Sequence, residues 1–359
     1  MAHIRRAHEL GREVDDGPQV FRATWGLRHS TRYTDNNKQS RKWTEELTSL
    51  AQRLGDESLL LEAQHCRWGD EFFGGNVPRL LETTEEGIRR YDAKRHAQLA
   101  EAFGGHDPGV CALVCHAIGL SLRGLPDQAR RTVERTLVLA GSLSHQPSNA
   151  WGHAIAGWTF MIIRDRRGGE CTGARTVALA EKFDLPMIRW YGRYFMGWAR
   201  AQGLTLSKGL ALMEEVFPSI VNEQFYKFLA VPLAEVRFDA GRVTDALALV
   251  DHALNTGEGP ASGLCVPEIH RLRGVLLRSL GSPAEEVECA LRTAVELAEE
   301  QGALLLKLRA ANSLARLWRD QGKVQQAREL LGPVYGWFTE GFDTFDLKEA
   351  KALLEELAA

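Results

Sequence analysis

Apolar residues recur every three or four positions along most of the chain, which is the spacing of amphipathic helices. Within residues 37–54, for example, Trp43, Leu47 and Leu50 lie at i, i+4 and i+7 and so share one helix face. Runs of alternating β-branched residues, and the Asn-Gly or Asp-Gly turns that join strands, are nearly absent. The pattern therefore predicts an all-α protein.

A short turn motif recurs between the predicted helices. Each copy follows an apolar helix, breaks it at a glycine and begins another amphipathic helix, at residues 123–129, 240–246, 281–286 and 321–327. The last three copies are about 40 residues apart, close to the period of helical-hairpin repeats. Because stacked hairpins bury their apolar faces only against their neighbours, we predict a right-handed α-solenoid of about seven or eight helical hairpins. The first helix of each hairpin should line its concave side.

Breaks in the pattern divide the chain into parts. Residues 93–108 interrupt the helical rhythm because Gly104 and Gly105 are flexible and Pro108 restricts the residue before it. Asp107 is expected to cap the helix that follows. The predicted parts are an N-terminal segment that is partly disordered or helical (1–18), two hairpins (19–92), a linker and turn (93–108), six hairpins (109–338) and a C-terminal capping helix (339–359).

Composition narrows the class of function. The 359 residues are 44% hydrophobic and 25% charged, enough to bury a large core. The formal net charge of −3 lacks the basic excess that nucleic-acid binding favours. The sequence contains no run of about 18 apolar residues, so it predicts no membrane span. The first eight residues lack the apolar core of a signal peptide. Six dispersed cysteines suit a reduced, cytoplasmic protein. We expect a cytoplasmic location, with neither nucleic acid nor membrane as a partner.

Several segments together resemble a known repeat region, at residues 105–113, 268–277, 313–322, 333–344 and 346–351. Through them the chain resembles the tetratricopeptide-type helical-repeat region of large bacterial signalling ATPases, often fused to class III adenylate cyclase domains. The resemblance implies a sensor or scaffold that regulates an attached or partner ATPase or cyclase, and it carries over no catalytic residue. The chain contains neither the G-x-x-x-x-G-K-[ST] phosphate loop of an ATPase nor a recognisable cyclase domain.

Cysteine and histidine residues form one candidate site. Cys111 and Cys115 are one helical turn apart, and thiolate with imidazole could bind zinc or form a nucleophile–base pair. The weak catalytic candidates are Cys66, Cys111, Cys115, His65, His106 and His116. No CxxC or HExxH pattern accompanies them, and His116 lies on a different face from Cys111. We therefore predict buried packing, with no metal and no cofactor.

Aromatic residues form a second candidate site. Trp190, Tyr194 and Trp198 lie at i, i+4 and i+8 along one helix. Such stripes usually pack inside, but their density here and the polar ends of Trp and Tyr also suit a binding groove. The predicted ligand-binding residues are Trp151, Trp190, Tyr194, Trp198, Tyr226, Glu268 and Arg271. A basic cluster at 164–167 is interpreted as charge that complements a helix C-terminus.

These patterns predict a regulatory protein-interaction or ligand-sensing module. Its concave groove would hold a peptide, a partner protein or a small molecule, and binding would favour one curvature of the solenoid. Two alternatives stay open, a stand-alone hydrolase that uses the Cys and His residues and a structural scaffold or dimerisation domain.

Overall fold

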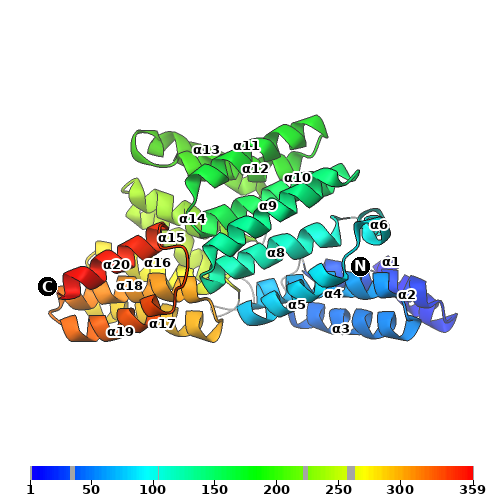
Figure 1. Cartoon of the computed structure of the whole chain (residues 1–359), viewed down its shortest axis with the longest axis horizontal. Helices are drawn as coiled ribbons and strands as arrows, with labels where there is room; N and C mark the ends of the chain where they lie inside the picture. Colours follow the sequence, from blue (N-terminus) through cyan, green and yellow to red (C-terminus); the bar gives the residue numbers. More distant parts are fainter. Residues whose placement is uncertain (1, 33–36, 104, 221–224, 257–262, 359) are drawn as a thin grey trace.

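The computed structural model describes residues 2–32, 37–103, 105–220, 225–256 and 263–358 (Figure 1). All regular secondary structure in these ranges is helical, and consecutive helices pack against one another. The prediction of an all-α solenoid is therefore confirmed. Within the same ranges, no helix combines the length and apolar character that crossing a bilayer requires.

The N-terminal part comprises α1 (Ala2–Glu13), α2 (Gly17–Arg32), α3 (Asn37–Leu54), α4 (Glu57–Gly74), α5 (Val77–Arg90) and the single-turn helices α6 (Ala93–His96) and α7 (Leu99–Ala102). The middle part comprises α8 (Pro108–Arg123), α9 (Pro126–Ser142), α10 (Gln146–Ile162), α11 (Arg166–Lys182), α12 (Pro186–Arg200), the 3-10 turn η1 (Gly203–Thr205) and α13 (Leu206–Ile220). The C-terminal part comprises α14 (Tyr226–Asp239), α15 (Val243–Asn255), α16 (Val266–Ser279), α17 (Ala284–Glu300), α18 (Leu304–Asp320), α19 (Val324–Gly336) and α20 (Phe345–Ala358).

Local sequence signals account for where helices begin. The Asp107 carboxylate accepts a hydrogen bond from the Val110 N–H at 2.9 Å, and α8 begins at Pro108, so the predicted cap is confirmed. The predicted N-terminal segment contains α1, and the predicted linker contains α6 and α7. The predicted terminal helix is α20, which packs against both α18 and α19. The division into the five parts itself stays a prediction.

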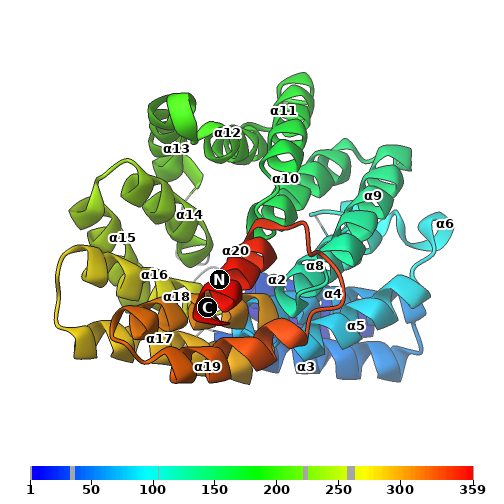
Figure 2. The same cartoon turned by 60° about the vertical axis from the view of Figure 1, so that its left-hand side comes forward.

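The solenoid curves until its C-terminal helices return to its N-terminal ones (Figure 2). Helix α18 contacts α8, and the Val77 N–H at the start of α5 donates to the Gln301 carbonyl at 3.1 Å. The Phe72 ring of α4 stacks on the Phe228 ring of α14, with centroids 4.7 Å apart. Hairpins from both halves of the chain therefore surround the inner side.

The segment between α19 and α20 holds this closure. Helix α9 has no side-chain cap of its own. Instead, the Glu340 carboxylate accepts hydrogen bonds from the backbone N–H groups of Asp127 at 2.8 Å and Gln128 at 3.0 Å. An anion is favoured there because the first N–H groups of a helix lack intrahelical partners. Gly341 follows with φ 74°, and a Cβ on it would lie 2.2 Å from Cγ of Pro126, so only glycine fits.

Replacing Glu340 with alanine should lower the free energy of unfolding by about 1–2 kcal/mol, because α9 loses its cap. The measurement is the shift in the urea midpoint. Glu296→Ala is the matched control, since Glu296 is exposed on α17, and its effect should stay within about 0.5 kcal/mol. Equal stability of the two variants would contradict the capping role.

Candidate ligand-binding cavity

An inner cavity of about 970 Å³ lies within the curve of the solenoid. Its walls come mainly from α12, α14, α16 and α18, which are the first helices of their hairpins, with the α10–α11 turn and the start of α20. Six arginines and four acidic residues line it: Arg164, Arg166, Arg271, Arg278, Arg309, Arg316, Glu235, Asp239, Asp346 and Glu349. The cavity therefore differs from an ordinary apolar core in the density of its charges.

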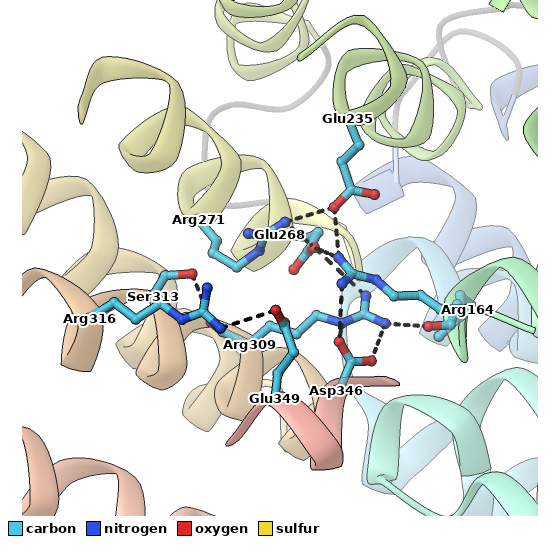
Figure 3. Close-up of polar contacts among 10 residues, drawn as sticks. Arg164, Glu235, Glu268, Arg271, Arg309, Ser313, Arg316, Asp346 and Glu349 are labelled. Atoms are coloured by element: carbon cyan, nitrogen blue, oxygen red, sulfur yellow. Dashed lines mark hydrogen bonds and ion pairs between the residues drawn. The ribbon is translucent and has the colours of Figure 1, made fainter. Parts of the chain in front are cut away.

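Arg309 and Asp346 form a two-point charge contact on this wall (Figure 3). The guanidinium of Arg309 on α18 donates to both carboxylate oxygens of Asp346 on α20, at 3.0 and 2.7 Å. Both residues are buried, and the fork geometry of arginine matches a carboxylate bidentately. Arg309 also donates to the carbonyl of Ile162 at the end of α10. One side chain thus joins three helices that are distant in sequence.

Two further arginines extend this contact. Arg164, in the α10–α11 turn, lies 3.3 Å from a carboxylate oxygen of Asp346 and 2.8 Å from one of Glu235. Arg271 on α16 lies 2.8 Å from Glu235 and 2.7 Å from Glu268. We call Arg164, Glu235, Glu268, Arg271, Arg309 and Asp346 the central ion network. It contains three positive and three negative side chains, so its formal charge is balanced.

The network lowers the pKa of two of its acids, Asp346 and Glu268. Burial by itself raises the pKa of Asp346, but Arg309 and Arg164 outweigh burial and bring that pKa below its usual value. Burial acts in the same way on Glu268, whose pKa Arg271 and Arg309 lower overall. Each buried charge is therefore compensated by its neighbours, and removal of one member leaves the others without a counter-charge.

Other groups on the cavity wall are not compensated in this way. The guanidinium of Arg166 lies 5.0 Å from the ring centroid of Trp198 and donates to the Trp198 carbonyl. Among the described residues, no ion pair joins Arg166 to a carboxylate. Arg271 Nε and Asn312 Oδ1 are buried and have no hydrogen-bond partner within the described chain. These groups could meet an anionic or hydrogen-bonding ligand.

The predicted ligand-binding residues separate into several places. Trp198 and Arg271 line the inner cavity, and Glu268 belongs to the central ion network. Tyr194 is fully buried and donates to the Leu229 carbonyl, so the stripe does not present it to a ligand. It is buried because α12 packs against α14 on this face.

The remaining aromatic candidates lie away from the inner cavity. Trp190 is flanked by the guanidinium groups of Arg189 and Arg193, 5.0 and 5.4 Å from its ring centroid. The Tyr226 ring meets the His252 ring at 4.9 Å. Ligand binding by these residues stays a prediction.

Trp151 belongs to a second site, because its ring lies 5.1 Å from that of His106. There the structure brings together His65, His106, Cys111 and Cys115 around a cavity of about 70 Å³. Cys66 lines the same cavity, whereas His116 lies apart, with Nδ1 2.9 Å from the Thr84 hydroxyl. The sequence therefore marked these residues as candidates, and the structure adds that His65, His106, Cys111 and Cys115 line one cavity.

Sequence reasoning missed most of the central ion network. The sequence pattern presents Arg164 only as charge at a helix end, and no local motif pairs Arg309 with Asp346. The Arg309 contact to Ile162 spans 147 residues of chain. The available signal was a charged residue in an otherwise apolar helix face, which on α18 is Arg309 between Leu305 and Asn312.

Comparisons with known proteins give limited information. No protein-family model matches the chain. The chain is 26% identical over 279 residues to an uncharacterized protein of Rhizobium meliloti (strain 1021), and the match covers 76% of this chain and 27% of that protein. The chain thus spans about a quarter of the relative's length.

Among solved structures, one similar chain is a circular tandem repeat protein with novel repeat topology and enhanced subunit contact surfaces. It is 16% identical to this chain, and the match covers 99% of this chain and 89% of that chain. The TM-score of 0.27 is too low to show a shared fold. The chain is a helical-repeat protein by its own architecture. Its tetratricopeptide type and its link to signalling ATPases stay predictions.

Asp346→Asn should destabilise the protein by about 3–5 kcal/mol at neutral pH, because Arg309 and Arg164 lose their shared counter-charge. Urea unfolding measures the loss. Asp343→Asn is the matched control, since Asp343 is exposed three residues earlier. Equal unfolding free energies for the two variants would contradict the role of the network.

The pH dependence has a defined sign. The pKa of Asp346 is depressed in the folded state, so its contribution is complete above the unfolded value of about 3.9 and is lost as pH falls through the folded pKa. Stability measured from pH 7 towards pH 2 should therefore fall more steeply in the wild type than in Asp346→Asn. Parallel curves would show that this carboxylate is not linked to folding.

Proposed function

We propose that the chain is a helical-repeat interaction module that senses a small ligand in its inner cavity. The proposal rests on one observation, a charged cavity of about 970 Å³ lined by helices from the middle and C-terminal parts of the chain. Sites for small molecules usually measure about 300–1,000 Å³ and combine apolar walls with a few convergent polar groups.

The wall favours a ligand that carries an anionic group beside a flat apolar part. Among the described residues, Arg166 offers a cation without an ion-paired carboxylate, and the Trp198 ring beneath it forms part of the apolar lining. Arg271 Nε and Asn312 Oδ1 offer a donor and an acceptor whose burial without partners is costly. A carboxylate or phosphate ester attached to a ring would accept from Arg166 and from Arg271 Nε, whereas Asn312 Oδ1 needs a hydroxyl or amino donor on the same ligand.

Binding would act through curvature. Arg166 and Trp198 lie on α11 and α12, whereas Arg271 and Asn312 lie on α16 and α18. A ligand that contacts both walls binds the closed curvature better than an open one and so shifts the population towards it. An attached or partner ATPase or cyclase domain, which the family resemblance implies, would read that shift.

The two alternatives receive no specific support. The Cys and His residues proposed for a hydrolase surround the separate cavity of about 70 Å³, which is smaller than the usual ligand site. Hydrolase activity and a purely structural role stay untested predictions.

A thermal-shift screen of carboxylates and phosphate monoesters, with and without an aromatic ring, tests the proposal. Compounds with both features should bind best, and Arg166→Gln should weaken the best of them at least tenfold in calorimetric titration, since hydrogen bonds to charged groups contribute about 1.5–3 kcal/mol. Arg167→Gln is the matched control, because Arg167 is exposed and outside the cavity. Binding only by neutral compounds or long peptides, or equal affinities for the two variants, would overturn the proposal.

A further inference from the structure

Three metal-binding side chains lie together outside the inner cavity, and a fourth, Cys115, lies beside one of them. His65 comes from α4, His106 from the turn before α8, and Cys111 and Cys115 from successive turns of α8. The ligand atoms of His65, His106 and Cys111 all lie within 4.8 Å of one another. Cys115 Sγ lies 3.9 Å from Cys111 Sγ. We call these four residues the His–Cys cluster.

The spacings within the cluster agree with a tetrahedral metal centre. Zinc–nitrogen bonds of about 2.0–2.1 Å and zinc–sulfur bonds of about 2.3 Å give tetrahedral edges of about 3.3 Å between two nitrogens and about 3.8 Å between two sulfurs. His65 Nε2 lies 3.2 Å from His106 Nε2, and the two sulfurs are 3.9 Å apart. Both edges are thus close to the size that one bound zinc ion requires.

We propose that His65, His106, Cys111 and Cys115 bind one Zn²⁺ ion. Two imidazoles and two thiolates are a ligand set typical of zinc, which prefers tetrahedral N and S coordination. Two thiolates also balance the charge of Zn²⁺, so the occupied site is neutral where it is sheltered from water. This proposal replaces the sequence-based expectation that no metal binds.

A second layer of contacts orients the ligands. His65 Nδ1 lies 3.3 Å from a carboxylate oxygen of Glu62, and the other oxygen of Glu62 accepts the Trp25 indole N–H at 2.8 Å. Glu62 is buried, so this pair is shielded from solvent. A carboxylate on the far nitrogen of a histidine fixes the ring and leaves Nε2 for the metal. This arrangement is the usual support of a zinc-bound histidine.

The turn that carries His106 is also fixed in place. The Asp107 N–H donates to the Ser148 hydroxyl at 2.7 Å, and the Asp107 carboxylate accepts from the Tyr91 hydroxyl at 2.8 Å. The neighbouring side chain of His106 therefore reaches the cluster from a defined backbone. Four protein ligands leave no open coordination position, which is typical of structural zinc. The ion would hold the turn at residues 105–107 against α4 and α8.

The short distances within the His–Cys cluster have a simpler explanation without a metal, which is one ordinary contact between two imidazoles and one between two thiols. Metal content of the full chain, purified without chelator and dialysed, separates the explanations. We expect one zinc per chain by mass spectrometry, and one equivalent of Co²⁺ bound after chelation. Bound Co²⁺ should show thiolate charge-transfer bands and the strong visible bands of tetrahedral cobalt.

Variants assign the ligands. Cys115→Ser should remove about half of the thiolate charge-transfer intensity, and Cys111→Ser should weaken Co²⁺ binding at least tenfold. Cys289→Ser and His116→Ala are the controls, because Cys289 is exposed and His116 lies on the same helix but outside the cluster. Both controls should bind one equivalent with the wild-type spectrum. Glu62→Gln, which removes only the supporting charge, should weaken binding about 10–100-fold.

Circular dichroism of each variant checks that the helices persist. If Cys111→Ser loses its helices, the metal content and the Co²⁺ spectrum of the wild type still test the zinc proposal. Substoichiometric zinc together with a Co²⁺ spectrum free of thiolate bands would overturn the proposal. Three other results would also overturn it: a different ion in place of zinc, a Cys111–Cys115 disulfide that re-forms after reduction, or equal Co²⁺ affinities for Cys111→Ser and Cys289→Ser.

Discussion

The closed curvature depends on the contact of the Arg309–Asp346 pair with the end of α10, through the Ile162 carbonyl and Arg164. Both side chains are buried, so each needs the other to offset the cost of leaving water. Asp346 is placed by α20, Arg309 by α18, and the Ile162 carbonyl that Arg309 also contacts ends α10. Opening the solenoid would separate α18 and α20 from the end of α10, so Asp346 would lose Arg164 and Arg309 would lose the Ile162 carbonyl. A helical-repeat chain usually stores its stability between neighbouring repeats, but here a substantial part lies between repeats that are distant in sequence.

This constraint also explains why the interior holds a cavity. Arginine and carboxylate side chains project inwards from α14, α16, α18 and α20 and form ion pairs with one another. These charged side chains occupy positions where apolar side chains would otherwise pack. The charges balance within the central ion network, so a ligand gains little from those groups. The polar groups left for a ligand to contact are those without a partner in the network, chiefly Arg166, Arg271 Nε and Asn312 Oδ1. If the cavity binds a ligand as proposed, stability and recognition would use different atoms of the same wall.

Sequence reasoning succeeded where the cause is local. The helical period, the glycine turns and the Asp107 cap each depend on a few adjacent residues, and each could be read directly. It failed where the partner is distant. The α9 cap is supplied by Glu340 from 212 and 213 residues away, and a bare leucine at the α9 N-cap gives no hint of it. The aromatic stripe shows the same limit, because periodicity marks a face as apolar without telling whether protein or a cavity lies opposite. Trp198 meets the cavity, whereas Tyr194 one turn earlier meets α14.

Helix α10 relates the two sites to each other. At its start, the Ser148 hydroxyl accepts the N–H of Asp107, next to the His–Cys cluster, and Trp151 contacts the ring of His106. At its end, the Ile162 carbonyl accepts from Arg309, and Arg164 follows directly into the central ion network. Between these ends, the buried Trp158 ring packs against Phe72 and Phe228 from opposite halves of the solenoid. Because α10 is held at both ends and in its middle, we infer that a shift of the turn at His106 would be transmitted along α10 to the wall of the inner cavity. A zinc ion that fixes that turn would therefore preorganise the ligand cavity from a distance, without contributing an atom to it.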